Sequence, residues 1–444
     1  MSTAAATGGR PLRFCLLSTF YPPWNFGGDG IHVQRLAHAL ADRGHRVTVV
    51  CAPKAHRILS RERPAEPPPH PGVEIVSLPD GLASLTGVYM SGRPLRSRRL
   101  LRRLLNGGFD VLHFHNPSLL GAPELLGMGE GLRLYTTHEQ WLLCPSHLLW
   151  RRGGRVCEDP PCWSCELSHR RPPQPWRRTG LLERSVRRLD AVIAPSLTTA
   201  RLHERFAPLT RLEVIEYFVP EPPAGEEERP PSGPRRRYFL YAGRLEPIKG
   251  VGSLVEAFRS RRSEDLVIAG DGGEARRLRR AAKDLPHVQF AGRLSHEELT
   301  RLYREAIAVV VPTLGHETGP LVPLEAFAVG TPAIVHSFGA LEELADRTGA
   351  AIAYRSPEDL RAALDRLAGD GRLRDDLGRR GKAEVEERHT AGTHLDRYLR
   401  LIASLAHERG NSELATAAQA ATASLEAPSR ANGPSASPNL APAR

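Results

Sequence analysis

The sequence predicts an α/β protein with two doubly wound domains that face each other across a cleft. Short apolar runs rich in β-branched residues alternate with longer helical patterns, which is typical of parallel sheets covered on both faces. A proline-rich segment at 221–237 interrupts this alternation, which then resumes. The chain has 444 residues, more than one ordinary core requires, and this length suits two domains.

The apolar runs form two series, one for each predicted sheet. The first series belongs to an N-terminal domain at 1–220 and comprises Arg13–Leu17, Val47–Cys51, Val73–Leu78, Val111–His115, Leu132–Thr136, Ala191–Pro195 and Leu212–Ile215. The second belongs to a domain at 238–390 and comprises Tyr238–Ala242, Leu266–Ala269, Val288–Ala291, Ala308–Pro312, Pro332–Val335 and Ala350–Ala353.

The remaining segments connect or extend these domains. Segment 221–237 combines prolines and acids and ends in three consecutive arginines, a composition that suits a hinge linker. We expect a C-terminal helix at 391–409 to pack back on the N-terminal domain. Beyond it, alanine, serine, proline and asparagine dominate, so residues 411–444 are predicted to be a disordered tail.

The overall charge excludes few classes of binding partner. A net charge of +11 could attract nucleic acid, an anionic membrane or phosphorylated substrates. No nucleic-acid motif or aromatic and basic platform accompanies it, so nucleic acid is not an expected partner. The first ten residues lack the apolar core of a secretory signal, and no apolar stretch is long enough to span a bilayer. We therefore expect a cytoplasmic protein, or one peripheral to the inner face of the membrane.

A basic turn opens the second domain. The run Tyr238–Ala242 leads into a turn that carries Arg244 and Lys249, just before a helical pattern at 251–258. A guanidinium, an ammonium and a helix N-terminus together suit a diphosphate. They would also stabilise the charge that develops when a diphosphate leaves. Two solvated surface cations are the alternative, and the turn alone does not decide between them.

A pair of glutamates follows a later strand of the same domain. Glu317 lies just past the run Ala308–Pro312, and Glu325 lies in the early turns of a helix, because Pro320 and Pro323 are tolerated only near a helix start. Carboxylates accept hydrogen bonds from sugar hydroxyls, often two at once. The alternative is that Glu325 only favours the helix dipole and Glu317 is solvated.

In this order the motifs resemble those of a known family, the retaining glycosyltransferases of family four, which have the GT-B fold. The likeness rests on Gly-Arg-Leu-x-x-x-Lys-Gly at 243–250, Gly-Asp-Gly at 270–272 and the seven residues between Glu317 and Glu325. It extends through Tyr21-Pro-Pro, Gly27-Gly28, Gly44-His45-Arg46-Val47, His138 and Ala194-Pro195-Ser196, and covers roughly residues 12–400. Some bacterial members carry a similar cysteine-bearing loop.

The resemblance implies an activity and a set of roles. A hexosyltransferase would move a sugar from a nucleoside diphosphate donor to an acceptor that the sequence does not name, with retention of configuration and without a metal. Arg244 and Lys249 would hold the diphosphate, Glu317 the sugar hydroxyls and Glu325 the ribose. His138 and Glu317 are the implied catalytic residues, with His138 near the reacting carbon.

The backbone of the donor site is also implied by the resemblance. Amides from Thr318, Gly319 and Leu321 would approach the sugar and phosphates, and Gly27 and Gly28 would let the first domain close on the donor. The family usually has Gly-Phe-Gly after the first glutamate, where this chain has Thr-Gly-Pro at 318–320. The proline removes an amide donor, so we expect the identity of the donor to be decided in this segment.

Four cysteines lie in one insertion-like stretch, at Cys144, Cys157, Cys162 and Cys165. The spacing Cys162-x-x-Cys165 occurs in metal knuckles, which makes a structural zinc one interpretation. The alternative is a set of reduced thiols packed in a loop near the acceptor side of the cleft.

A second open question is the basic amphipathic helix at 96–105, which alternates arginine pairs with leucine pairs. Such helices can lie on anionic membranes, but they also pack leucines on a sheet with arginines in water. Contact with an anionic membrane is therefore an optional partner in this interpretation. The competing functions are a nucleotide-sugar epimerase of the same fold, a non-catalytic protein that binds sugar nucleotides or metal, and a charge-driven surface binder.

Overall fold

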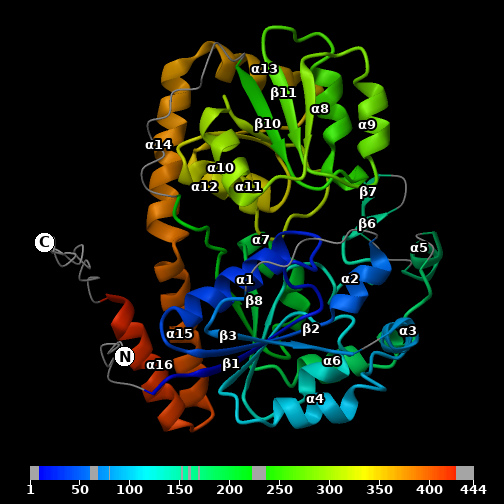
Figure 1. Cartoon of the computed structure of the whole chain (residues 1–444), viewed down its shortest axis with the longest axis vertical. Coiled ribbons are helices and arrows are strands. Elements are labelled where there is room, and N and C mark those ends of the chain that lie inside the picture. Colours follow the sequence, from blue (N-terminus) through cyan, green and yellow to red (C-terminus); the bar gives the residue numbers. More distant parts are fainter. Residues whose placement is uncertain are drawn as a thin grey trace, which may run out of the picture.

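The computed structural model describes residues 10–60, 69–79, 81–151, 154–158, 162–168, 171–222 and 237–426. It shows two α/β domains stacked along the long axis of the molecule, joined at one side by long C-terminal helices (Figure 1). Each domain has a parallel sheet with helices on its faces, so the predicted fold class is confirmed.

The first sheet has seven strands in the order β3-β2-β1-β4-β5-β8-β9. The chain order reverses between β1 and β4, and ligands of doubly wound sheets bind at such a switch point, beyond the carboxyl ends of the strands. The strands are β1 (Arg13–Ser18), β2 (Arg46–Cys51), β3 (Val73–Ser77), β4 (Val111–Asn116), β5 (Leu132–Thr136), β8 (Ala191–Ala194) and β9 (Arg211–Val214).

Both faces of this sheet are buried, as continuously apolar strands require. Phe14 and Leu16 of β1 belong to one apolar cluster, whereas Cys15 and Leu17 belong to another, because successive side chains of a strand point to opposite faces. The helices of this domain are α1 (Gly28–Ala41), α2 (Pro53–Leu59), α3 (Leu82–Ser91), α4 (Arg98–Leu105), α5 (Cys162–Ser168), α6 (Leu181–Val186) and α7 (Leu197–His203). They are joined by the 3-10 turns η1 (Glu124–Gly127), η2 (Pro175–Arg178) and η3 (Glu204–Phe206). A short antiparallel hairpin joins β6 (Trp150–Arg151) and β7 (Arg155–Val156).

The second sheet repeats the plan with six strands in the order β12-β11-β10-β13-β14-β15. These are β10 (Tyr238–Ala242), β11 (Asp265–Ala269), β12 (Val288–Gly292), β13 (Val309–Val311), β14 (Ala333–His336) and β15 (Ala351–Tyr354). The helices are α8 (Val251–Ala257), α9 (Ala275–Ala281), α10 (His296–Glu305), α11 (Leu321–Ala328), α12 (Ala340–Thr348), α13 (Pro357–Gly369) and α14 (Gly371–Arg388), with the 3-10 turn η4 (Pro247–Lys249).

The C-terminal part of the chain returns to the first domain. Helix α15 (Ala391–Glu408) buries Leu395, Tyr398 and Ile402 in the same apolar cluster as Phe14. Helix α14 precedes it along the side of the second domain (Figure 1). The chain thus crosses between the domains twice, once before β10 and once between α14 and α15.

The predicted tail begins with a further helix, α16 (Ser412–Glu426), so the prediction of disorder is wrong for that segment. Its Leu414 and Ala418 are buried in the first domain's core. The alanine-rich composition resembles low complexity, but alanine has the highest helix propensity and gives a small apolar face that packs closely on α15. Residues 427–444 lie outside the described residues.

The two segments in which the chain crosses between the domains are hydrogen-bonded to each other. The Val219 amide donates to the His389 carbonyl at 3.0 Å, and Nδ1 of His394 lies 2.7 Å from the Glu216 carbonyl. The carboxylate of Glu216 lies within 3.1 Å of guanidinium nitrogens from Arg347 and within 3.0 Å of Arg388. Of the predicted linker at 221–237, residues 223–236 lie outside the described part of the chain.

None of the described helices is both long and apolar enough to cross a membrane.

Candidate functional site

The candidate donor residues of the second domain lie on loops that follow the carboxyl ends of β10 and β13. These loops pack backbone against backbone at Gly250, which has a φ of +67°; a Cβ there would lie 2.0 Å from the Pro312 carbonyl oxygen. The Leu314 amide donates to the Ile248 carbonyl at 2.8 Å. A glycine is therefore required at 250, and it brings the basic turn beside the loop of Glu317.

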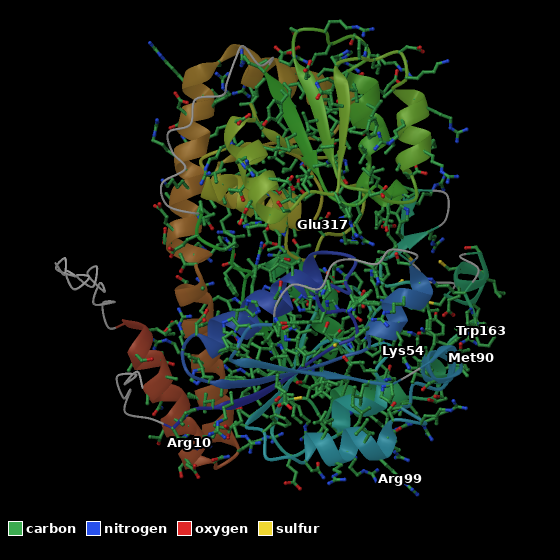
Figure 2. The ribbon with its side chains drawn as sticks, viewed as in Figure 1. Arg10, Lys54, Met90, Arg99, Trp163 and Glu317 are labelled. Atoms are coloured by element: carbon green, nitrogen blue, oxygen red, sulfur yellow. The ribbon has the colours of Figure 1, made fainter. Side chains whose placement is uncertain are left out.

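Glu317 and Lys249 form an ion pair within this loop cluster. Nζ of Lys249 lies 2.6 Å from Oε1 of Glu317, and the Thr313 hydroxyl donates to the same oxygen at 2.8 Å. Burial by itself would raise the pKa of Glu317, but the charge and hydrogen bond of Lys249, with the Thr313 hydroxyl, outweigh it and lower the pKa below 4.5. Glu317 is therefore ionised, and it lies at the boundary between the domains (Figure 2).

Glu325 lies one helix turn into α11 and meets two other elements. Nη2 of Arg35, on α1 of the first domain, lies 2.6 Å from Oε1 of Glu325. The Tyr303 hydroxyl, on α10, donates to Oε2 at 3.2 Å. Burial, and then the nearby Glu325, raise the pKa of Tyr303 well above 10, so its hydroxyl stays protonated. The second glutamate thus joins both domains.

The glycine pair at the start of α1 faces the basic turn and α11. A Cβ at Gly28 would lie 2.9 Å from Cδ1 of Leu321, and a Cβ at Gly27 would lie 3.8 Å from Nε of Arg244. Arg244 itself is 42% exposed and pairs with Glu246 at 2.7 Å. The predicted residues Gly27, Gly28, Arg244 and Leu321 are therefore neighbours across the domain interface.

Thr318 is held by the first domain. Its carbonyl accepts hydrogen bonds from the hydroxyls of Ser196 at 2.7 Å and Thr199 at 3.0 Å. Its own hydroxyl donates to the carbonyl of His138 at 3.0 Å. These bonds orient the loop between the two glutamates by contacts from the opposite domain.

Gly319 and Pro320 complete this loop. A Cβ at Gly319 would lie 2.6 Å from a ring carbon of Tyr217, so only glycine fits against that ring. Pro320 is the residue that caps the start of α11. A proline beside the first turn disrupts no intrahelical bond, because the amides there have no partner within the helix.

His138 belongs to a buried chain of histidines and tyrosines in the first domain. Its Nδ1 lies 2.5 Å from the Tyr217 hydroxyl, and its Nε2 lies 2.8 Å from Nδ1 of His115. The next strand position on that face, His113, lies 2.9 Å from the Tyr398 hydroxyl of α15. Burial lowers the pKa of His138 to about 3, against the attraction of Glu139, so the ring is neutral. Both ring nitrogens are engaged by the protein.

Sequence reasoning missed three residues of this region: Arg35, Tyr217 and Tyr303. Arg35 and Glu325 are separated by 290 positions in the chain. An arginine on an amphipathic helix is ordinarily a solvated residue, so no local signal marks it. Tyr217, a residue just after β9, carries no motif either.

The zinc interpretation of the four cysteines stays a prediction. Among the described residues, no three histidine, cysteine or carboxylate side chains come together in a way that could hold a metal ion. Cys144 is buried, with Sγ 3.2 Å from the Ser146 hydroxyl, while Cys162 and Cys165 lie on α5. A zinc-bound loop would need a different arrangement, and metal analysis of the purified protein tests the hypothesis.

Comparison with protein families assigns both halves of the chain. Residues 26–221 match the family described as Glycosyltransferase Family 4, and residues 226–384 match Glycosyl transferases group 1. The first match covers every strand of the first sheet except β1, and the second covers all six strands of the second sheet.

Individual relatives agree at low identity. A D-inositol 3-phosphate glycosyltransferase of Paenarthrobacter aurescens is 26% identical over 85% of this chain and 94% of its own length. A phosphatidyl-myo-inositol mannosyltransferase of Mycobacterium tuberculosis is 27% identical over 77% of this chain and 83% of its own length. An uncharacterised glycosyltransferase of Methanocaldococcus jannaschii is 31% identical, but the match spans only 35% of this chain and 41% of that protein.

Solved structures give the fold. The sucrose-phosphate synthase of Thermosynechococcus elongatus superposes with a TM-score of 0.67 at 20% identity, over 88% of this chain and 100% of that chain. The Anabaena protein HepE, in complex with UDP and glucose, superposes with a TM-score of 0.65 at 17% identity, over 88% and 100%. With both halves assigned and the two-sheet architecture shared, the chain is a glycosyltransferase of the GT-B fold, similar to family 4.

Proposed function

We propose that the protein is a retaining glycosyltransferase that moves a hexose from a nucleoside diphosphate donor to an acceptor with an anionic group. The observation that carries this proposal is the cluster of Lys249, Glu317, Arg244 and Glu325 at one end of the second sheet, against the first domain. An epimerase is not favoured, because the family matches and the named relatives are glycosyltransferases.

The donor diphosphate would take the place of the internal ion pairs. Lys249 would exchange the Glu317 carboxylate for a phosphate oxygen, and Arg244, which is partly exposed, would bind a second oxygen. Glu317 would then accept hydrogen bonds from the sugar hydroxyls, and Glu325 from the ribose. The two cations would neutralise the leaving diphosphate without a metal.

The loop at 318–321 would place the sugar. The amides of Thr318, Gly319 and Leu321 would approach the sugar and the phosphates, and Gly27 and Gly28, which have no side chain, allow α1 to approach this loop. We assign His138 a positioning role, since its ring nitrogens bond to other side chains and its carbonyl holds Thr318. A direct contact between His138 and the sugar, as the family resemblance implies, would require those bonds to change.

A uridine nucleotide is the first donor to test, because HepE has been solved with UDP, with UDP and glucose, and with UDP-glucose. UDP-, GDP- and ADP-hexoses would be screened by thermal shift and by release of nucleoside diphosphate, with Lys249→Ala as a matched control. A stabilised wild type and an unresponsive variant are expected. If no donor stabilises or is hydrolysed by the wild type, with or without acceptors, the proposal fails.

Retention is tested separately. Once a donor and an acceptor are known, the anomeric proton coupling of the product is read by NMR immediately after transfer. The same configuration as in the donor supports the retaining assignment, and the opposite configuration refutes it without affecting the transferase assignment.

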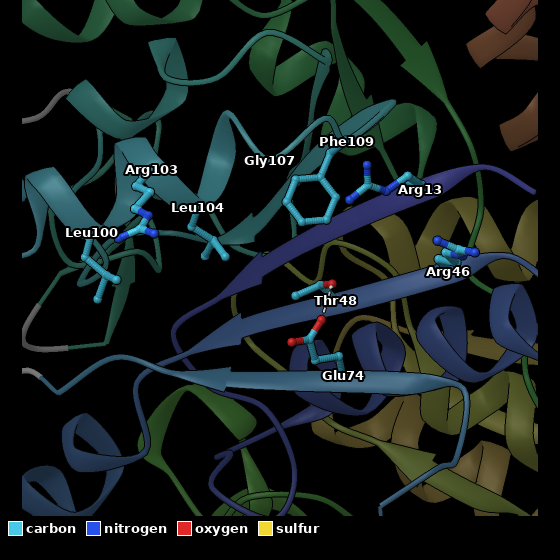
Figure 3. A pocket seen from close by; sticks show the side chains of 9 residues that line it. All are labelled: Arg13, Arg46, Thr48, Glu74, Leu100, Arg103, Leu104, Gly107 and Phe109. Atoms are coloured by element: carbon cyan, nitrogen blue, oxygen red, sulfur yellow. Dashed lines mark hydrogen bonds between the residues drawn. The ribbon is translucent and has the colours of Figure 1, made fainter.

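The first domain carries a basic surface at the amino ends of its strands, the end away from the donor site, and this surface suits an anionic partner. Arg13, Arg46 and Arg103 line a pocket of about 580 Å³ beside α4, together with the apolar Leu100, Leu104 and Phe109 (Figure 3). A second pocket of about 450 Å³ on the same helix includes Arg98, Arg102, Arg184 and Arg188. We propose that this surface contacts an anionic membrane, where an inositol phospholipid of the kind named in the mannosyltransferase relatives would be found.

Liposome flotation tests this contact. The Arg99→Glu, Arg103→Glu double variant should lose binding to vesicles with 30% phosphatidylserine, while Arg276→Glu, Arg280→Glu on α9 of the second domain should keep it (vesicle composition chosen as roughly that of an anionic leaflet). Equal binding by both double variants, or none by the wild type, would refute the membrane contact.

A further inference from the structure

Arg35 is a first-domain residue whose charged group reaches into the donor-binding region of the second domain. It lies on α1, and Nη2 of Arg35 is 2.6 Å from Oε1 of Glu325 on α11. The two side chains are 13% and 12% exposed, so the pair is nearly shielded from water. Ion pairs at such low exposure keep most of their electrostatic coupling, unlike pairs on the surface.

The contacts of Glu325 show which of its hydrogen-bond acceptor positions remain free. Tyr303 donates to the other oxygen, Oε2, at 3.2 Å. A carboxylate has about four lone-pair positions. The two contacts with Arg35 and Tyr303 therefore fix the orientation of the carboxylate and leave acceptor positions for two further hydroxyls.

Arg35 also carries an unused donor. Its Nη1 is buried and has no hydrogen-bond partner among the described residues. An unsatisfied buried donor is unfavourable, so the side chain is held in place by its contact with Glu325 and by packing, and not by a full set of bonds. Arg35 contacts the other domain although one of its buried donors is unsatisfied, which indicates a role other than stabilising the fold.

We propose that Arg35 is a positioning residue for the donor: it holds the carboxylate of Glu325 across the domain interface so that its free lone pairs face the two ribose hydroxyls. Recognition of the ribose then depends on contact between the two domains. This inference rests on the proposed function, in which Glu325 binds the ribose.

The chemistry of arginine matters for this role. Its guanidinium is planar and holds a carboxylate in a defined orientation, whereas the ammonium of lysine is a mobile point charge. Removing the guanidinium would leave Oε1 of Glu325 without its partner, so that the carboxylate could turn away from its present orientation. Its free lone pairs would then no longer be directed at the ribose hydroxyls, and the preference for ribose would fall.

The test measures that preference directly, by isothermal titration of the whole protein with two probes. One is whichever of UDP, GDP and ADP binds the wild type, and the other is its 2′,3′-dideoxy counterpart. The wild type should bind the ribonucleotide about tenfold or more tightly, since hydrogen bonds to charged groups contribute at this level. Arg35→Met should reduce the ratio to about threefold or less, and Arg35→Lys should lie between.

Glu343→Gln is the matched control. Glu343 on α12 also spans the domains, accepting from the Leu197 amide at 2.9 Å and from the Thr198 amide and hydroxyl at 2.7 Å each. It lies outside the proposed donor set, so its variant should weaken the domain contact yet keep the ratio of the wild type.

Each outcome is decisive. If Arg35→Met weakens both probes equally and keeps the ratio, or if Glu343→Gln lowers the ratio as much, Arg35 is merely structural and the inference is overturned. If Glu325→Gln itself keeps the ratio, the ribose assignment of the proposed function fails instead. Circular dichroism melts of the Met and Lys variants exclude unfolding as the cause of any loss.

Discussion

The two faces that meet at the domain interface are built from opposite kinds of groups. The second domain presents charges that are paired, with Lys249 on Glu317 and Glu325 on a partner from the other domain. The first domain presents a buried chain of neutral rings, in which His115, His138 and Tyr217 are hydrogen-bonded in series. The second domain can bind a diphosphate and hydroxyls, whereas the first domain can hold the loop at 318–321 in place.

Charge and position are thus supplied by separate domains. Glu317 stays ionised because Lys249 compensates its burial, while burial keeps the pKa of His138 low and its ring uncharged. The histidine chain therefore adds no charge that would compete with the donor. It contacts the donor-binding loop through the carbonyl of His138 and the side chain of Tyr217.

The largest expected effect comes from breaking the charged side. Lys249→Ala should lower the turnover number about 10²–10³-fold, as loss of a transition-state contact does. It should also lower the free energy of unfolding by about 3 kcal/mol, because Glu317 is left buried and unpaired. Urea unfolding and steady-state kinetics measure the two effects.

The double variant Lys249→Met, Glu317→Gln separates the effect on turnover from the effect on stability. It should recover most of the stability, since no unpaired charge remains, but none of the activity. Recovery of activity would contradict the role assigned to this pair.

A smaller effect is expected from the contact between the two sides. Gly319→Ala would place a Cβ 2.6 Å from the Tyr217 ring, and such overpacking should cost about 1–3 kcal/mol in stability and weaken donor binding. Gly273→Ala is the control, because a Cβ there meets no atom within 4 Å. Calorimetric melts of both variants would decide; equal melting temperatures would show that the loop yields easily.

The buried, neutral ring of His138 should make the stability of the protein depend on pH. Burial lowers the pKa of His138 to about 3, below an unfolded value of about 6.5, so the unfolded chain binds more protons between these values. Its contribution is fully present above pH 6.5 and is lost as the pH falls, by about 1.4 kcal/mol per pH unit. His138→Asn should flatten the slope of unfolding free energy between pH 6.5 and 4.5, while His407→Asn on the exposed side of α15 should leave it unchanged.

The smallest effect is expected from one hydroxyl. Tyr217→Phe removes the contact with Nδ1 of His138 and should cost about 1 kcal/mol of stability, with little change in the pKa of the neutral ring. If turnover fell more than about tenfold, the chain would take part in the reaction and would not merely support the loop.

The sequence predicts much of the charged side of the interface but little of the neutral side. Arg244, Lys249, Glu317 and Glu325 lie at fixed spacings around predicted strands, and β10 and β13 bring them together as parallel neighbours do. On the neutral side, His138 was predicted from the resemblance alone. Its bonds to His115 and Tyr217 were not, because they join three segments of the first domain that are far apart in the sequence.

Local sequence is sufficient to predict the alternation of strands and helices, the division into two sheets and the charged residues at the carboxyl ends of the strands. Hydrophobic period and turn chemistry are local, so they can be recognised along the chain. The folded molecule is needed to see that Arg35 meets Glu325, that the first domain holds Thr318, and that 412–426 is a helix packed on α15. These features depend on which surfaces face each other once two domains and a returning C-terminal helix have packed, and no short stretch of sequence contains that information.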